Sequence, residues 1–271
     1  MQADYWKQKV CLVTGASSGL GLAIAKALAK REARVVLTAR EVVPLEQAAQ
    51  TLRAAGDEAQ AIAADVTQQD QVDRLAEQIG SQYGRLDLLC NCAGRSDRKK
   101  VIETTPDDFQ QLLDVNFLAA VRTTRTLAPL LIERQGHVVN IGSLACKVAP
   151  RFMGAYPASK FALAAYSQQL RLELGPAGLH VLLVCPGPIA REQSAARYAN
   201  QTADLPAAAQ QPGAGAKLRG IDPDRLAEKI LVACQRRRLE LIMPGGARLL
   251  FALSQISPRL GDWLLRRATS G

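Results

Sequence analysis

The sequence predicts an α/β fold, in which one doubly wound sheet of seven parallel strands carries helices on both of its faces. Short apolar runs alternate with segments of helical period along most of the 271 residues. Such strand–helix–strand repetition pairs strands in parallel through right-handed crossovers. Aromatic residues make up only 4% of a chain that is 48% hydrophobic. Aliphatic side chains must therefore fill the core, as is typical of parallel strands covered by helices.

Seven apolar runs are the expected strands: residues 10–14, 34–39, 59–64, 86–91, 137–142, 180–185 and 239–243. The segment between the first two runs has one apolar helical stripe, which consists of Leu20, Ala23, Ile24, Ala27 and Leu28. Residues 191–220 have no clear period and are rich in Ala, Gln, Pro and Gly. We expect this segment to be a substrate loop or lid within a single catalytic domain of residues 1–244.

Residues 245–271 are expected to form a basic, amphipathic C-terminal extension. Ser257 can cap a short helix that has Pro258 at its first position. That helix has an apolar face and a basic C-terminal end, made by Leu260, Trp263, Leu264, Arg266 and Arg267. Its apolar stripe fits either packing on the chain's own domain or a partner subunit, or reversible attachment to an anionic bilayer.

Charge and residue counts exclude several classes of protein. Lys and Arg exceed Asp and Glu by 34 − 25 = 9, but the basic tail lacks interleaved aromatics, so no nucleic-acid partner is expected. Six cysteines without a CxxC spacing argue against a disulfide frame and for a reducing, cytoplasmic compartment. The two histidines, His137 and His180, each stand just before a Val-rich strand pattern, so both are expected at strand edges. A histidine zinc site or a Ser-His-Asp hydrolase therefore has little material to work with. No metal, signal peptide or spanning helix is expected.

A glycine-rich loop joins the first expected strand to the first expected helix. It reads Thr14-Gly15-Ala16-Ser17-Ser18-Gly19-Leu20-Gly21. Glycines permit a tight turn and let backbone N–H groups and the helix N-terminus approach a pyrophosphate. Glycines at a turn are weak evidence alone, but their position between strand and helix predicts a dinucleotide site.

The end of the second expected strand indicates which dinucleotide is bound. A dinucleotide fold often carries an acid there for the ribose 2′-hydroxyl, or an arginine for a 2′-phosphate. This chain has Ala39-Arg40 at that point, which favours NADP(H) over NAD. The alternative is that Arg40 only solvates the end of a strand.

Further motifs follow in a fixed order. They are Asp65-Val66 after the third strand, Asn91-Cys92-Ala93-Gly94 after the fourth, Asn116 on the next helix, Ser143 after the fifth, Tyr156-x-x-x-Lys160, and Pro186-Gly187-Pro188-Ile189 after the sixth. In order and spacing the chain resembles the classical short-chain dehydrogenase/reductase family, closely over about residues 7–190. The resemblance implies a Rossmann-type domain and an NADP(H)-dependent oxidoreductase that acts on a carbonyl or alcohol group.

The resemblance also implies a role for each matched residue. Tyr156 is the acid/base, Lys160 holds the nicotinamide ribose, Ser143 hydrogen-bonds the substrate oxygen, and Asn116 positions a water that relays protons. A free tyrosine, with a pKa near 10, is a poor base at neutral pH, and a neighbouring ammonium favours its phenolate. The cofactor contacts are carried over to Gly15, Ser17, Ser18, Gly19, Leu20, Gly21, Arg40, Asp65, Val66, Asn91, Ala93, Gly94, Tyr156, Lys160, Pro186, Gly187 and Ile189.

Two positions depart from the family pattern. Cys92 stands where the family usually has a second Asn, and it is expected to be a buried thiol without a catalytic role. Ala190 and Arg191 occupy the stretch where a Thr often contacts the nicotinamide amide, so that contact is in doubt.

Two other functions compete with reduction of a small carbonyl substrate. One is a sensor or scaffold that binds NADP without turnover, and the other is a 3-oxoacyl-thioester reductase whose basic surface docks an acidic carrier. The pocket wall is expected from residues 144–155 and 191–220, whose side chains suit an apolar substrate. The resemblance implies a homodimer or homotetramer, in which the helices of about residues 106–133 and 156–174 pair across a two-fold axis. The apolar runs at 117–120 and 161–165 would otherwise leave exposed patches.

Overall fold

The sheet is built as the sequence predicts. The computed structural model describes residues 4–190, 205–206, 209, 215 and 218–269. Its seven strands are all parallel and stand in the order β3-β2-β1-β4-β5-β6-β7. They are β1 (Val10–Thr14), β2 (Arg34–Ala39), β3 (Ala59–Ala63), β4 (Leu88–Asn91), β5 (His137–Ile141), β6 (His180–Pro186) and β7 (Glu240–Met243). Each lies within two residues of the expected run.

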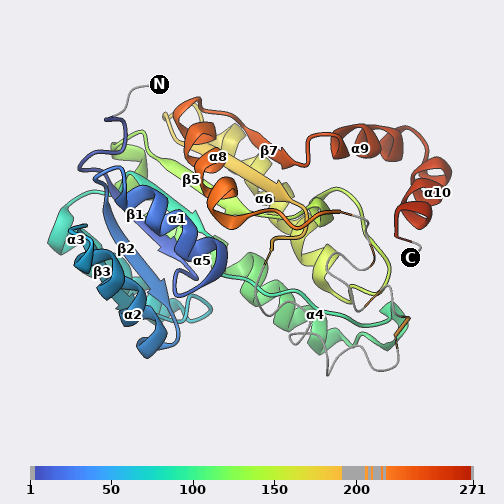
Figure 1. Cartoon of the computed structure of the whole chain (residues 1–271), viewed down its shortest axis with the longest axis horizontal. Helices are drawn as coiled ribbons and strands as arrows, with labels where there is room; N and C mark the ends of the chain where they lie inside the picture. The colour runs from blue at the N-terminus through green and yellow to red at the C-terminus, as the bar shows by residue number, and fades with distance from the viewer. Residues whose placement is uncertain (1–3, 191–204, 207–208, 210–214, 216–217, 270–271) are drawn as a thin grey trace.

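Helices cover both faces of this sheet (Figure 1). One apolar core joins the sheet to α1 (Gly19–Ala29), α2 (Val42–Ala54) and α8 (Pro223–Gln235). A second core joins the other face to α3 (Gln69–Tyr83), α5 (Ala119–Glu133) and α6 (Tyr156–Leu174). The predicted stripe of α1 is buried along its whole length, which confirms the helical period found in the sequence.

The order of the strands creates a crevice at the carboxyl edge of the sheet. β1 pairs with β2 on one side and with β4 on the other, so the chain crosses to opposite faces at this point. In open α/β sheets the ligand lies in the crevice outside the carboxyl ends of the strands at such a switch. The hydroxyl of Thr14, the last residue of β1, accepts hydrogen bonds from the amides of Cys92 and Ala93, both at 3.0 Å. The two strand ends are thereby fixed to one another.

Two helices follow β7 at the end of the molecule away from β1–β3 (Figure 1). They are α9 (Ala247–Ile256) and α10 (Pro258–Ala268), and α10 packs against α9. As expected from the sequence, Ser257 caps α10, its hydroxyl accepting a hydrogen bond of 3.3 Å from the amide of Leu260. None of the described helices is both long and apolar enough to cross a membrane. Most of the segment 191–220, the predicted lid, lies outside the described residues.

The two histidines form a buried pair at the amino edge of the sheet. His137 and His180 open the adjacent strands β5 and β6, and their Nδ1 atoms are 2.8 Å apart. The carbonyl of Arg238 can only accept, so His180 donates from Nε2 and, when neutral, accepts from His137 at Nδ1. His137 then accepts at Nε2 from the hydroxyl of Tyr5, at 2.6 Å. Cys234 brings a third candidate metal ligand within 4.8 Å, but every histidine nitrogen already has a partner.

Acid is expected to destabilise the fold through this pair. Burial, and after it the neighbouring His180 ring, lowers the pKa of His137 to about 2. The unfolded chain binds a proton near pH 6.5 and the folded chain does not. The contribution to the free energy of unfolding is therefore complete above about pH 6.5 and declines as the pH falls toward the folded value, by up to about 1.4 kcal/mol per pH unit.

Urea unfolding of the wild type and of His137→Asn at pH 7.5 and pH 5.5 measures this effect. The wild type should lose more stability between the two pH values than the variant, because carboxyl groups contribute equally to both proteins. Equal losses in the two proteins would contradict the assignment.

Candidate active site

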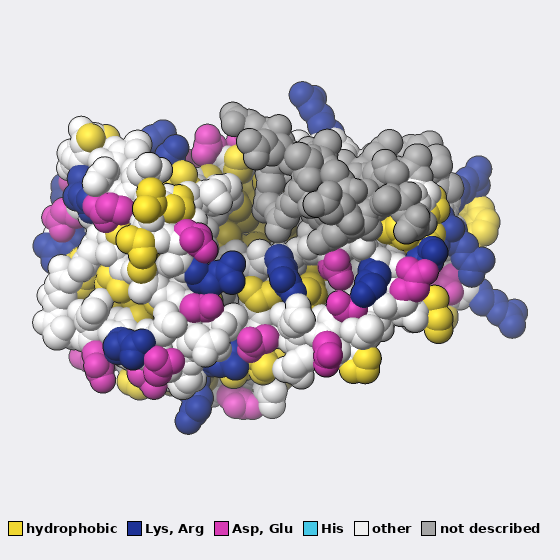
Figure 2. All heavy atoms as spheres, turned by 90° about the horizontal axis from the view of Figure 1, so that it is seen from below, with side chains coloured by type: hydrophobic (Ala, Val, Ile, Leu, Met, Phe, Trp, Pro, Cys, Tyr) yellow, Lys and Arg dark blue, Asp and Glu magenta, His cyan; other side chains and the backbone are white. Residues whose placement is uncertain are grey.

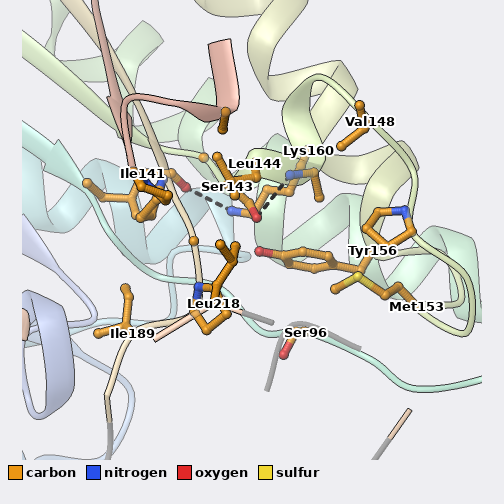
Figure 3. Close-up of a pocket in the computed structure, with 18 of the residues that line it drawn as sticks. Ser96, Ile141, Ser143, Leu144, Val148, Met153, Tyr156, Lys160, Ile189 and Leu218 are labelled. Atoms are coloured by element: carbon orange, nitrogen blue, oxygen red, sulfur yellow. Dashed lines mark hydrogen bonds between the residues drawn. The ribbon is translucent and has the colours of Figure 1, made fainter. Parts of the chain in front are cut away.

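Three predicted catalytic side chains meet at the carboxyl edge of β5. Ser143 lies two residues after the end of β5 and caps the short helix η3 (Leu144–Cys146). Tyr156 and Lys160 lie four residues apart on the first turns of α6, which has Pro157 in its first turn. Figure 3 shows the hydroxyl of Tyr156 pointing toward the side chains of Ser143 and Lys160. The structure thus brings together a serine hydroxyl, a phenol and an ammonium group.

The ammonium group of Lys160 is held in place by the end of β5. Lys160 is only 5% exposed, and its Nζ donates a hydrogen bond of 2.9 Å to the carbonyl oxygen of Ile141. The same Nζ lies 5.8 Å from the centre of the Tyr156 ring. Burial lowers the pKa of Lys160, and the nearby thiols of Cys146 and Cys92 act in the opposite direction. A cation in this low-dielectric position acts strongly on the adjacent phenol.

Asn116 clamps the loop after β4 to α6. It lies in η2 (Asp114–Leu118), a π-helical turn between α4 (Pro106–Leu113) and α5. Its Nδ2 donates to the carbonyl oxygen of Arg95 at 2.9 Å and to the hydroxyl of Ser159 at 3.0 Å. Its Oδ1 accepts from the amide of Arg95 at 2.9 Å. The wider π turn, a feature frequent at functional sites, turns this amide inward.

The loop needs a glycine beside that clamp. A Cβ on Gly94 would lie 2.8 Å from Oδ1 of Asn116 and 3.7 Å from Nζ of Lys160. Any side chain at position 94 would therefore press on the amide of Asn116, whereas its distance to the ammonium group of Lys160 is an ordinary van der Waals contact.

The glycine-rich loop leaves the N-terminus of α1 open to an anion. Gly15 and Gly19 have φ values of +64° and +56°, a region that favours glycine. A Cβ on Gly15 would lie 3.0 Å from the backbone of Ala93, and one on Gly21 would collide with the carbonyl oxygen of Gly15. Ser18 makes no side-chain cap to α1, and the first turn of that helix holds no acidic residue. The N–H groups and the positive end of the helix dipole fit the pyrophosphate of a dinucleotide.

The predicted adenine-side residues lie at the ends of β2 and β3. Arg40 follows β2 and is exposed, and its guanidinium makes no ion pair with a described carboxylate. Asp65 forms a local turn, in which its Oδ1 accepts from the amide and the hydroxyl of Thr67 at 3.0 Å and 2.7 Å. Val66 is buried in a small apolar cluster with Ala119. Arg40 and Asp65 therefore both lie just after the carboxyl ends of the neighbouring strands β2 and β3.

The side chain of Asn91 is hydrogen-bonded inside the protein. Its Nδ2 donates to Asn140 at 2.9 Å and to Thr124 at 3.2 Å, and its Oδ1 accepts from Thr123 at 2.8 Å. This buried amide is occupied inside the protein, so it positions the loop that carries Ala93 and Gly94.

A cavity of about 640 Å³ is lined by Ser143, Tyr156 and Lys160, the three predicted catalytic residues. Pro186, Gly187 and Ile189 line it beside Leu20 of the glycine-rich loop. Its outer wall comes from the expected segment 144–155, through Leu144, Val148, Pro150 and Met153, and from Leu218. The lining is mostly aliphatic (Figure 3), which suits an apolar substrate.

The sequence reasoning missed one wall of this cavity. Both C-terminal helices line it, through Ala247, Leu250 and Phe251 of α9 and Leu265 of α10, and Thr269 directly after α10 lines it as well. Phe251 is 7% exposed and joins an apolar cluster with Cys185 and Ile242. The amphipathic period of the C-terminal segment predicted that one face of it is covered. The local sequence could not show that the substrate cavity lies against that face.

The chain is similar to known proteins over nearly its whole length. Residues 9–202 match the family model of short chain dehydrogenases. A ketoacyl reductase, HetN, from a Nostoc species is 34% identical over 95% of this chain and 88% of that protein. A fatty acyl-CoA reductase from Acinetobacter baylyi is 39% identical, over 62% of this chain and 58% of that protein.

Solved structures agree with these relatives. A short-chain dehydrogenase from Streptomyces avermitilis superposes with a TM-score of 0.79 at 32% identity, covering 97% of this chain and 98% of that one. A metagenomic short-chain oxidoreductase in complex with NADP superposes with a TM-score of 0.72 at 32% identity, covering 88% of this chain and 97% of that one. A Burkholderia phymatum enzyme in complex with NAD gives a TM-score of 0.83 at 26% identity, covering 94% and 95%. The chain belongs to the short chain dehydrogenase family.

Proposed function

We propose that this oxidoreductase uses NADP(H) and interconverts a carbonyl and an alcohol on an apolar substrate, with Tyr156 as the acid/base. The convergence of Tyr156, Ser143 and Lys160 on the floor of an aliphatic cavity carries the proposal. This set of groups also argues against a sensor or scaffold that binds the cofactor without turnover.

The roles follow from where each group lies. In the reducing direction the hydroxyl of Tyr156 donates a proton to the carbonyl oxygen, and Ser143 donates a hydrogen bond to the same oxygen. Lys160 is proposed to favour the phenolate that remains and to hold the nicotinamide ribose. Asn116 is proposed to position a water that relays protons, and its hydrogen bonds to Arg95 and Ser159 hold its amide in place. The nicotinamide, when bound, supplies or accepts the hydride.

A second candidate activity is reduction of an acyl thioester or a 3-oxoacyl thioester. It is favoured by the names of two relatives, a ketoacyl reductase and a fatty acyl-CoA reductase. The aliphatic cavity and the net charge of +9 suit an acyl chain on an acidic carrier. Both activities are tested by incubating the protein and NADPH with ketones, aldehydes, sterols and acyl thioesters. The decrease in NADPH absorbance measures the reduction of each substrate. If none of these substrates oxidises NADPH, the proposed function is wrong.

Arg40 is proposed to select NADPH over NADH, because it can pair with the 2′-phosphate and β2 ends in Ala39 rather than in an acid. NADPH should bind at least several-fold more tightly than NADH, and Arg40→Ala should narrow that gap. Fluorescence titration of both cofactors measures it, with Arg74→Ala on α3 as the control for loss of an exposed arginine. Equal affinity for the two cofactors in the wild type would rule out the assignment.

We further propose that the protein is a homodimer or homotetramer in a reducing, cytoplasmic compartment. All six cysteines are free, which supports the compartment. On α6, Phe161 and Leu172 are 41% and 72% exposed, and this supports a subunit contact on that helix. Within the two predicted contact runs, Ala119, Ala120 and Leu163 are buried by the chain's own core.

A further inference from the structure

The C-terminal helices α9 and α10 have two distinct faces. Their inner face lines the cavity, through Leu250, Phe251 and Leu265. Their outer face exposes large apolar side chains: Leu249 by 67%, Ile256 by 80%, Leu260 by 38% and Trp263 by 53%. In α9 the exposed residues Leu249, Ala252 and Ile256 recur at helical spacing, and in α10 Leu260 and Trp263 do so. The outer face is therefore an apolar stripe that the described chain leaves uncovered.

Positive charge borders this stripe. Arg248, Arg259, Arg266 and Arg267 are all exposed, and Asp262 is the single acidic residue in 247–268. The guanidinium of Arg267 lies 5.2 Å from the centre of the Trp263 ring. At the end of the molecule that carries α9 and α10, Figure 2 shows basic and hydrophobic side chains lying side by side. Apolar side chains that include a tryptophan, edged by arginines, are typical of helices that lie in a lipid interface.

We propose that α9 and α10 dock on an anionic bilayer surface, with Leu249, Ile256, Leu260 and Trp263 inserted at the headgroup boundary. The four arginines pair with lipid phosphates, and an anionic leaflet attracts each of them. Because α10 is only 11 residues long, the contact is peripheral and reversible. The opposite side of the same helices is cavity wall, so the bilayer lies about one helix diameter, roughly 10 Å, from the substrate.

A second copy of this chain fits the stripe less well. A two-fold contact would place the patch against itself, because such interfaces are self-complementary. Four arginines would then face four arginines across the contact, with one aspartate on each side to offset them. Like charges brought together oppose association, whereas an anionic lipid surface neutralises them.

Vesicle binding by the full-length protein tests the proposal. The protein should co-sediment at low salt with vesicles of phosphatidylglycerol and phosphatidylcholine, less with phosphatidylcholine alone, and be released by 0.5 M salt. Trp263 reports the contact directly, because the other tryptophan, Trp6, is fully buried. Its emission should shift to the blue and be less quenched by acrylamide when vesicles are added. Trp263→Phe should abolish that shift.

Matched variants distinguish binding through the outer face of α9 and α10 from an effect of exposed apolar residues or of net charge anywhere on the protein. Leu260→Ser/Trp263→Ser should reduce vesicle partitioning at least tenfold, whereas Val43→Ser, at a 67% exposed position on α2, should not. Arg266→Gln/Arg267→Gln should reduce it more than the equally charged Arg134→Gln/Arg225→Gln. Melting temperatures check that each variant is folded.

Three results would overturn the proposal. One is the absence of co-sedimentation at low salt. Another is equal vesicle binding by the variants in α10 and by their controls at Val43, Arg134 and Arg225. The third is a smaller assembly of Leu260→Ser/Trp263→Ser in light scattering, which would assign the stripe to a second copy. None of these outcomes bears on NADPH oxidation by a soluble substrate, so the docking surface and the proposed function fail separately.

Discussion

Turnover is expected to fall by roughly 10²- to 10⁴-fold when Tyr156 is replaced by phenylalanine, the range over which a positioned acid or base accelerates a reaction. The ring remains, so the packing and the cofactor site should be preserved. Only the hydroxyl that faces Ser143 is lost, and with it the proton that the substrate oxygen must receive.

Kinetics and binding together distinguish this effect from damage to the site. In Tyr156→Phe the kcat on any accepted substrate should fall while the Kd for NADPH changes little. In Lys160→Ala the kcat should fall and the Kd for NADPH should rise. Retention of most of the activity by Tyr156→Phe would show that the assigned mechanism is wrong.

Replacement of Gly21 by alanine is expected to weaken NADPH binding by at least tenfold. The added Cβ would collide with the carbonyl oxygen of Gly15, which is backbone and cannot rotate away as a side chain can. Either the loop or the start of α1 must move, and the N–H groups then no longer converge on the pyrophosphate. Titration of NADPH measures the loss.

Gly80→Ala is the matched control for that variant. Gly80 also lies in a helix, α3, and a Cβ there would meet nothing within 4 Å. Alanine is about 1 kcal/mol more favourable than glycine inside a helix, so this variant should bind NADPH normally and be slightly more stable. Normal binding by Gly21→Ala would show that the loop does not approach the cofactor as closely as proposed.

Local pattern was sufficient for the sheet, for the first helix and for placing Tyr156 and Lys160 at the start of one helix. The stripe of α1 and the glycine-rich loop are encoded within about 20 residues, as a dinucleotide fingerprint is. Tyr156 and Lys160 were separable from the similar spacing Tyr5-x-x-x-Lys9 because Pro157 marks a helix start and Ser143 precedes it. These features require no knowledge of distant contacts.

Features that depend on distant contacts could not be predicted. In the π turn, the side chain of Asn116 is hydrogen-bonded to Arg95 and Ser159, and Gly94 lacks a Cβ that would collide with it. All three residues are more than 20 positions away in the sequence. The cavity wall from α9 and α10 needs the position of the tail in space. The histidine pair did carry a signal: His137 and His180 both open Val-rich strands, and equal register in neighbouring parallel strands sets them side by side.

The central place of β1 also constrains how the chain acquires its structure. β1 pairs with β2 across a short separation, but its other partner, β4, begins at Leu88. The first strand therefore remains half-paired until the residues between Thr14 and Leu88 have been synthesised, and its apolar edge is exposed in the meantime. Parallel pairing between such distant segments closes large loops and folds slowly. Early intermediates of this protein should therefore depend on chaperones to shield that edge from aggregation.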